Sequence, residues 1–309
     1  MRAVRFDGYG DESVLEIREV PDPEPGEGEV VVRVVTAGTN PGEAAIRSGA
    51  LAERWPTTFP EGEGSDLAGF IAAVGPGVTG FAIGQPVIGL SDGRNAQAEL
   101  VLVPAGRVVP KPDALGWDVA ATLYVAGTTA HALLQEVPVD AHDTVVVAGA
   151  AGGVGVFLTQ LAVGTGATVI AVAGESNQEW LRAHGATPLV YGDGLEERLR
   201  AAAPDGVTAF FDLFGAGYTD IAVALGVPVD RVATIADFGA AGRLGVKVTG
   251  MSALRDPAEG VRLLAAIASS GGFEVPIKGR FPLESVGDAY REVSKRSGLG
   301  KVILEVSQP

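Results

Sequence analysis

The chain has 309 residues, of which 47% are hydrophobic, and this is enough for two domains with separate cores. It contains no cysteine, which excludes disulfides, thiolate metal ligands and a cysteine nucleophile. The formal net charge of −15 argues against nucleic acid or an anionic membrane surface as a partner. The first residues lack an apolar signal core and no run has the character of a membrane span, so we expect a cytoplasmic protein.

Short stretches with β character make up the first 120 residues. Strands are predicted at residues 1–6, 15–20, 29–37, 68–74, 86–90 and 98–103. Segments rich in proline and glycine, such as PDPEPGEGE, separate them. No alternation of strands and helices appears before Asp118, so we expect an irregular β-rich domain here.

A different pattern begins near residues 118–124. The sequence WDVAATLYVAGTTAHALLQ predicts a helix that leads into the next unit. Residues 145–147 are all valine, which is typical of a strand buried on both faces of a parallel sheet. A glycine-rich turn follows, and from Val154 onward apolar residues recur at helical spacing. Strand, tight turn and helix together form the phosphate-binding unit of a dinucleotide fold.

The glycines of this turn suit a pyrophosphate. Gly152 and Gly153 let the backbone come close to the ligand, and Gly155 allows the helix and the strand to pack tightly. The helix start offers free N–H groups and a positive dipole end. Ala150 stands where the G-x-G-x-x-G fingerprint has its first glycine, so the motif alone also fits a glycine-rich turn in another α/β protein.

The alternation of strands and helices then continues. Further strands are predicted at residues 168–173, 189–191, 209–214, 231–235 and 246–249, with helices at 195–203 and 218–225. Glu175 lies about 20 residues past the glycines, where a dinucleotide fold contacts the adenosine ribose. Ser176 and Glu179 predict a capping box for a helix through Trp180. The resulting six strands are the count of a doubly wound α/β domain.

After the six strands a helix is expected, and residues 273–309 then return to the short strands of the first part. A helix is predicted at residues 256–269, and the residues expected on its apolar side are Val261, Leu263, Leu264 and Ile267. A second helix at residues 283–294 and a strand at 301–306 follow. We expect this tail to pair back onto the first domain.

The whole chain resembles the medium-chain dehydrogenase/reductase family, and in detail its zinc-free quinone oxidoreductase branch. Five segments carry the resemblance in the family's order: TAGTNPGEAAIRSG, FPEGEGSDLAGFIAAVGPGVTGFAIGQPVIG, VAGTTAHALL, AGAAGGVG and GKVIL. It implies a GroES-like catalytic domain of residues 1–121 and 262–309 and a dinucleotide-binding Rossmann domain of residues 122–261. It also implies a homodimer, formed through an edge strand at residues 245–249.

The resemblance further implies chemistry without zinc. Zinc-dependent relatives carry a histidine and an acid at positions that here are Ser65 and Asp66, and their cysteine ligand is absent. The three histidines, His131, His142 and His184, have no spacing with carboxylates that suggests a metal cage. No metal site is therefore predicted. The remaining chemistry is hydride transfer by a bound nicotinamide.

Two residues are expected beside the nicotinamide from the resemblance, Asn40 and Thr129. For Asn40 the alternative is a structural role, because Asn-Pro is also a common turn dipeptide. For Thr129 the alternative is that its neighbour Thr128 contacts the nicotinamide instead. Ala45 stands where several quinone reductases carry a tyrosine, which leaves no obvious side-chain proton donor. A quinone tolerates this because its oxygens can take protons from water, whereas an enoyl thioester benefits from a placed acid.

The sequence is mixed on the choice of cofactor. Glu175 would accept from a ribose 2′-hydroxyl and repel a 2′-phosphate. Tyr191 and Arg296 match a tyrosine and an arginine that hold the 2′-phosphate in related quinone reductases, although they also fit an exposed loop tyrosine and a solvated cation. We predict NADPH, with NADH possible. The predicted cofactor-binding residues are Thr128, Gly152, Gly153, Val154, Gly174, Glu175, Asn177, Tyr191, Phe214, Ile235 and Arg296.

The predicted function is a zinc-independent, NADPH-dependent reductase of quinones or related α,β-unsaturated carbonyls. One alternative is an enoyl reductase that acts on acyl thioester or polyketide intermediates. Another is a cofactor-binding protein with little turnover. The walls of the substrate pocket are expected from the loops at residues 50–60, 91–95 and 238–244, which leave the substrate itself open.

Overall fold

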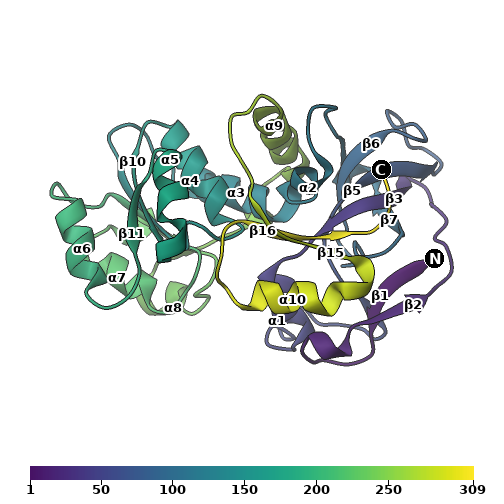
Figure 1. Ribbon diagram of the computed structural model, residues 1–309, viewed down its shortest axis with the longest axis horizontal. Helices are drawn as coiled ribbons and strands as arrows, with labels where there is room; N and C mark the ends of the chain where they lie inside the picture. The colour runs from purple at the N-terminus through teal and green to yellow at the C-terminus, as the bar shows by residue number, and fades with distance from the viewer.

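The computed structural model describes residues 1–309, and Figure 1 shows them as two lobes arranged along the longest axis. One lobe holds α4 to α8 around a sheet, and the other is rich in strands and contains both chain ends. The strands form a six-stranded, a seven-stranded and a three-stranded sheet. None of the helices combines the length and the apolar character needed to cross a membrane.

The six-stranded sheet is parallel throughout. Its strands, in spatial order, are β11 (Thr187–Val190), β10 (Thr168–Ala173), β9 (Thr144–Ala148), β12 (Ala209–Asp212), β13 (Val232–Thr234) and β14 (Lys247–Val248). The chain order 3-2-1-4-5-6 confirms the predicted doubly wound fold. Strand order reverses beside β9, so a ligand crevice is expected at the carboxyl ends of β9 and β12.

Burial on both faces explains the uninterrupted valines of β9. Val145 and Val147 belong to one hydrophobic core, whereas Val146 and Ala148 belong to another on the opposite face. The helices around this sheet are α4 (Gly155–Gly164), α5 (Gln178–Ala183), α6 (Leu195–Ala202), α7 (Tyr218–Ala224) and α8 (Ala240–Leu244). Residues of α4 and α5 pack in the first core and those of α6, α7 and α8 in the second.

The β-rich lobe is built on the seven-stranded sheet. Its members are β15 (Ile277–Pro282), β16 (Lys301–Glu305), β3 (Glu29–Gly38), β5 (Asp66–Val74), β6 (Pro86–Leu90) and β8 (Val108–Pro110), with β7 (Leu100–Pro104) also paired to β3. The small sheet contains β2 (Glu16–Glu19), β1 (Arg2–Phe6) and β4 (Glu61–Gly62). Antiparallel pairing of β16 with β3 joins the C-terminal tail to the first part of the chain, as predicted.

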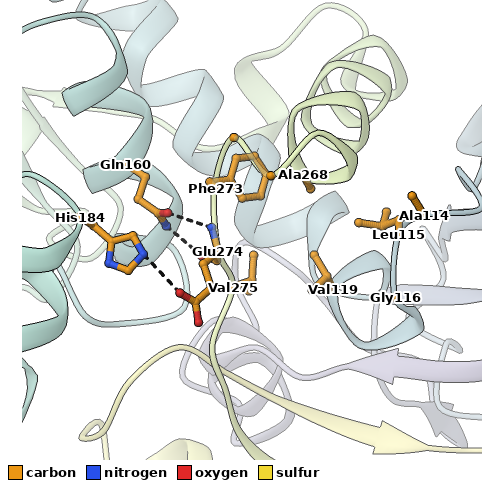
Figure 2. Close-up of a pocket in the computed structure, with 12 residues that line it drawn as sticks. Ala114, Leu115, Gly116, Val119, Gln160, His184, Ala268, Phe273, Glu274 and Val275 are labelled. Atoms are coloured by element: carbon orange, nitrogen blue, oxygen red, sulfur yellow. Dashed lines mark hydrogen bonds and ion pairs between the residues drawn. The ribbon is translucent and has the colours of Figure 1, made fainter.

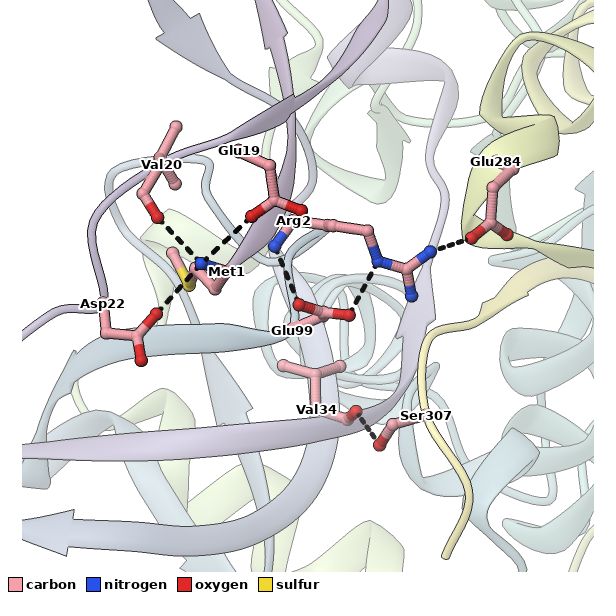
Figure 3. Close-up of polar contacts among 9 residues, drawn as sticks. All are labelled: Met1, Arg2, Glu19, Val20, Asp22, Val34, Glu99, Glu284 and Ser307. Atoms are coloured by element: carbon pink, nitrogen blue, oxygen red, sulfur yellow. Dashed lines mark hydrogen bonds and ion pairs between the residues drawn. The ribbon is translucent and has the colours of Figure 1, made fainter.

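Side-chain contacts fasten both chain ends to this lobe (Figure 3). The backbone N–H and the side chain of Arg2 both donate to the Glu99 carboxylate, at 2.7 and 2.8 Å. The same guanidinium also donates to Glu284, in the turn before α10 (Val286–Ser294). Ser307 donates to the Val34 carbonyl at 2.6 Å. Residues near both chain ends are therefore held in the β-rich lobe.

The helix predicted over residues 117–135 is interrupted. The chain forms α2 (Trp117–Ala120), a π-helical turn η3 (Leu123–Gly127) and α3 (Thr128–Glu136). A tertiary contact explains the break, because the Asp66 carboxylate accepts the Val125 N–H at 2.7 Å and diverts it from a helical bond. A short helix that was not predicted, α1 (Pro41–Arg47), follows β3.

Two other local predictions are wrong. No capping box forms at Ser176, because the chain makes a 3-10 turn over Glu175–Asn177 and α5 begins without a side-chain cap. The Gln178 amide instead donates to three nearby carbonyl groups. In α9 (Pro257–Ser269), Leu263 is 47% exposed, since it points away from the buried side that Val261 and Leu264 share.

Candidate active site

The turn between β9 and α4 lies at the carboxyl end of the parallel sheet. Gly149 has a φ of +84°, a conformation that favours glycine, and an added Cβ would lie 3.4 Å from Leu213 Cβ. The residue that makes the tight turn is therefore Gly149, and this explains why Ala150 is tolerated in the fingerprint. A Cβ on Gly155 would collide with the Gly149 carbonyl oxygen, so the close packing of turn and helix requires glycine there.

The outer side of this turn suits a phosphate group. Gly152 is exposed, and an added Cβ would meet only the Gly149 carbonyl oxygen, at 3.3 Å. The N–H groups of Gly153 and Val154 donate to no group of the protein. Unpaired N–H groups at the start of a ten-residue helix, together with the helix dipole, favour an anion. These residues fit the pyrophosphate of a dinucleotide.

Three of the residues predicted to bind the adenosine end lie together after β10 and β11. A Cβ on Gly174 would be 3.5 Å from the Tyr191 ring and 4.0 Å from the Asn177 amide nitrogen. That amide donates to the Gly298 carbonyl at 3.3 Å, so it also contacts the C-terminal return. Glu175 is exposed and its carboxylate makes no hydrogen bond or ion pair with the protein, so this group lies in water.

Two other predicted cofactor-binding residues, Phe214 and Ile235, follow β12 and β13. Asp212 is fully buried and accepts from the Phe214 N–H at 3.0 Å and from the Thr234 hydroxyl at 2.8 Å. The Asp212 carbonyl accepts the Ile235 N–H at 3.1 Å. Arg296 donates to the Phe214 carbonyl at 2.6 Å. One buried carboxylate thus fixes the loops that carry Phe214 and Ile235.

Asn40 lies in a buried polar network at the junction of β3 and α1. Its Oδ1 accepts from Lys301 Nζ at 2.6 Å, and its Nδ2 donates to Asp66 Oδ2 at 2.8 Å and to Glu43 Oε1 at 3.1 Å. Glu43 also accepts the Asn40 N–H and the Tyr290 hydroxyl, each at 2.8 Å. Asn40 thus stands before Pro41 at the turn into α1, and its side chain also forms three hydrogen bonds.

Burial sets the electrostatics of this network. It raises the pKa of Asp66 to about 6, against the opposing charge of Lys301. The pKa of Lys301 is lowered by the same cause, with Asp66 and Glu43 opposing. Glu63, whose carboxylate lies 3.0 Å from Arg47 Nη1, has its pKa raised to about 7 by burial. The network therefore holds ionisable groups that burial has shifted towards their neutral forms.

The two threonines differ in what they can reach. Thr128 is fully buried and its hydroxyl donates to the Tyr124 carbonyl. Thr129 makes no side-chain hydrogen bond within the protein, so its hydroxyl keeps its full capacity. Asp66 links this region to Asn40, because it accepts from Val125 in η3 as well as from the amide of Asn40. The structure thus connects the segments that carry Asn40 and Thr129.

The loops predicted to wall the substrate pocket contact one another. The guanidinium of Arg54 stacks on the rings of Trp55, at 4.6 Å, and of Phe238, at 5.1 Å. Arg94 donates to the Thr57 hydroxyl at 3.4 Å. Residues 50–60 therefore meet residues 91–95 in one lobe and residues 238–244 in the other.

Two cavities lie elsewhere. One of about 550 Å³ is bordered by Gln160, His184 and Glu274 and by apolar residues from both lobes (Figure 2). A second, of about 400 Å³, borders Arg5 and Asn95. Neither is lined by a predicted catalytic or cofactor-binding residue, although Asn95 at the second lies in a loop predicted to wall the substrate pocket. The site is therefore assigned from the backbone and side-chain geometry around the predicted residues.

The histidines are engaged in ordinary contacts. His131 bonds to Gln135 at 2.8 Å, His184 lies 3.3 Å from Glu274, and His142 is exposed. No group of three or more His, Asp or Glu side chains is arranged to hold a metal ion.

Sequence reasoning missed Lys301 and Glu43 as parts of the site. Lys301 is present in the GKVIL segment, which was used only for its resemblance and as a strand. The signal that could have identified it is a lysine placed just before a fully buried apolar strand, where a charge needs a partner. Glu43 follows Asn40 at capping-box spacing, which was likewise overlooked.

The chain is similar to known proteins in sequence and in fold. The family model for the alcohol dehydrogenase GroES-like domain matches residues 26–113. Quinone oxidoreductases of Rattus norvegicus and Pseudomonas aeruginosa are each 28% identical, over 98% of this chain and 97% and 99% of theirs. The solved quinone oxidoreductase of Coxiella burnetii has a TM-score of 0.89 at 26% identity, covering 99% of both chains.

A mycobacterial protein solved in complex with NADPH has a TM-score of 0.86 at 29% identity, covering 99% of this chain and 100% of that one. The likeness in sequence and in fold extends over both lobes. These likenesses in sequence and fold support a zinc-independent, quinone oxidoreductase-like member of the medium-chain dehydrogenase/reductase family.

Proposed function

We propose that this chain, an NAD(P)H-dependent oxidoreductase of that family, transfers hydride from NADPH to a quinone or a related α,β-unsaturated carbonyl. The position of Lys301 is the observation that carries the proposal. A Cβ on Gly153 would lie 2.9 Å from Lys301 Cδ, and Lys301 Nζ donates to Asn40 at 2.6 Å. One side chain thus runs from the turn that suits a pyrophosphate to the amide expected beside the nicotinamide.

The residues of the crevice have separate roles in this proposal. The N–H groups of Gly153 and Val154 bind the pyrophosphate at the start of α4. Asn40 and Thr129 orient the nicotinamide end. The adenosine end is held by Gly174, Asn177, Tyr191 and Arg296, and Phe214 and Ile235 also contact the cofactor. When bound, NADPH supplies the hydride, and the protein supplies orientation.

Two observations support NADPH over NADH. Glu175 lies in water without a partner, so solvent screens its repulsion of a 2′-phosphate. Arg296 is exposed and adds positive charge beside Phe214. A relative that is 29% identical over nearly its full length was solved with NADPH.

A quinone is favoured over an enoyl thioester by the side chains available. Ala45 occupies the position where related reductases carry a tyrosine, so α1 provides no tyrosine hydroxyl as a proton donor. The reduced oxygens of a quinone take protons from water, whereas protonation at carbon benefits from an acid. The Arg54 guanidinium contacts the rings of both Trp55 and Phe238, which come from different lobes, and these rings offer flat apolar surfaces to a planar substrate.

An NADPH oxidation assay tests the proposal, with separate panels of quinones, enals and crotonyl-type thioesters. Turnover of quinones, lost in Asn40→Ala, supports it. Turnover of thioesters alone would make the chain an enoyl reductase. Tight NADPH binding with no turnover of any panel would make it a cofactor-binding protein.

The family resemblance also supports a homodimer, which we include in the proposal. β14 is an edge strand that pairs only with β13, so its other edge is open to a second copy. Light scattering after size-exclusion chromatography measures the mass. A monomer at micromolar concentration would contradict this part. The cytoplasmic location stays a prediction.

A further inference from the structure

We propose that Lys301 is a positioning residue that fixes the direction of the Asn40 amide and couples it to the glycine turn. This inference rests on the proposed function, because it concerns how Asn40 meets a bound cofactor. Lys301 is 3% exposed, and its ammonium donates to the Thr39 carbonyl at 2.8 Å and to Asn40 Oδ1 at 2.6 Å. Few lysines are buried this deeply unless the charge has a specific task.

The hydrogen bonds around Asn40 leave one orientation. Both hydrogens of Nδ2 are used, one by Asp66 and one by Glu43, while Oδ1 faces an ammonium. A flipped amide would point N–H groups at Lys301 and its oxygen at two carboxylates, so the flip is disfavoured at every contact. The remaining capacity is the second lone pair of Oδ1. Asn40 therefore offers a ligand an acceptor, which suits an N–H donor such as a carboxamide.

Lys301 is also held against the glycine turn. Gly300 N–H donates to the Ala151 carbonyl at 2.9 Å, and a Cβ on Gly153 would lie 2.9 Å from Lys301 Cδ. Gly300 has a φ of +84°, and an added Cβ would collide with the Pro276 carbonyl, so only glycine brings the return strand this close. The segment Gly300–Lys301 thus joins the pyrophosphate end of the site to Asn40.

The charge of Lys301 matters as well as its shape. Asp66 and Glu43 are both buried beside Asn40, and Lys301 is the ammonium that bonds within this group. Removing the cation would leave buried carboxylates without compensation, which favours rearrangement of their shared partner. Lys301→Met retains most of the stem that lies on Gly153 but removes the donor and the charge.

A double-mutant cycle with Lys301→Met, Asn40→Ala and the combined variant tests whether Lys301 acts through Asn40. NADPH affinity, measured by cofactor fluorescence, and kcat with a quinone are the two readouts. Each single variant is expected to lower kcat about tenfold or more, and the combined variant no more than about twofold below Asn40→Ala. In affinity, the loss caused by Lys301→Met should likewise disappear in the Asn40→Ala background. Multiplicative losses in either readout would overturn the inference.

Lys278→Met is the matched control. Lys278 lies on β15 of the same return, is largely buried and donates to two carbonyls, but it contacts neither Asn40 nor the glycine turn. It should leave both readouts near the wild-type value. Lys301→Arg keeps a charged donor, so its losses of NADPH affinity and of kcat should be smaller than those of Lys301→Met. It also serves as the test variant if the Lys301→Met protein fails to fold.

The affinity cycle keeps the two proposals apart. A wild type that binds NADPH and reduces no quinone contradicts the proposed function, while the cycle on NADPH affinity still tests Lys301. A folded Lys301→Met protein with wild-type NADPH affinity and wild-type kcat would overturn the inference and leave the proposed function standing.

Discussion

The guanidinium of Arg296 lies 4.1 Å from the centre of the Phe214 ring and donates to the carbonyl of the same residue at 2.6 Å. This pair links the C-terminal return to the loop after β12. Arg296 has a φ of +47°, a backbone conformation that residues other than glycine rarely adopt. Only part of the donor fork is used, and the exposed side chain keeps N–H groups for an anion.

Arg296→Ala should therefore weaken NADPH binding about tenfold or more and change NADH binding little, because a bond to a charged group contributes about 1.5–3 kcal/mol. Fluorescence titration of both nucleotides measures this. Lys295→Ala is the matched control, since Lys295 is the exposed neighbour and pairs with Glu292. Equal losses for both nucleotides, or a wild type that prefers NADH, would assign the choice to Glu175.

The glycine turn gives a pair of opposite expectations. Gly152→Val places its side chain on the exposed side of the turn and should raise the dissociation constant for NADPH about tenfold or more while the melting temperature changes little. Gly155→Val should destabilise the protein, because its Cβ would collide with the Gly149 carbonyl. Unchanged cofactor affinity in a folded Gly152→Val protein would mean that the pyrophosphate lies elsewhere.

The contact between the lobes at Arg54 should affect the substrate and spare the cofactor. Phe238→Ala removes the ring under this guanidinium and a flat surface at the expected pocket. We expect KM for a quinone to rise about threefold to tenfold, with NADPH affinity within about twofold of wild type. Leu102→Ala, which truncates an exposed residue on β7, controls for loss of apolar surface. Unchanged KM would remove these loops from the substrate site.

The parallel sheet was predictable to within a few residues at each strand, because each strand is a short apolar run with turn residues on either side. β9 shows why, since consecutive residues enter opposite cores and none can be polar. The interruption at η3 was not predictable, because helical spacing continues through residues 117–135. Its cause is the carboxylate of Asp66, which lies 59 residues before Val125.

The candidate site likewise has one part that was predictable from the sequence and one part that was not. The glycine turn depends on neighbours in sequence, and its motif was recognisable. The surroundings of Asn40 depend on partners 26 and 261 residues away, Asp66 and Lys301, which meet only after β16 has paired with β3. Local pattern carries no information on such contacts.

Glu63 provides a prediction for stability against pH. Burial raises its pKa to about 7 in the folded protein from an ordinary value of 4.5, and the charge of Glu43 adds to the shift while Arg47 opposes it. The folded state then holds the proton more tightly than the unfolded chain does. This contribution to stability is complete below about pH 4.5 and is lost as pH rises through about 7.

Glu63→Gln cannot ionise and should lack this decline, so its free energy of unfolding should fall less than that of wild type between about pH 5 and about pH 8. Over that window the free energy of unfolding of wild type should fall more than that of Glu63→Gln by an amount on the order of 3 kcal/mol. Urea unfolding at several pH values measures it. Glu61→Gln is the control, because it removes the carboxylate that pairs with Arg94 but retains Glu63, and it should keep the wild-type decline. Parallel curves for Glu63→Gln and wild type would show that Glu63 stays charged in the fold, held so by Arg47.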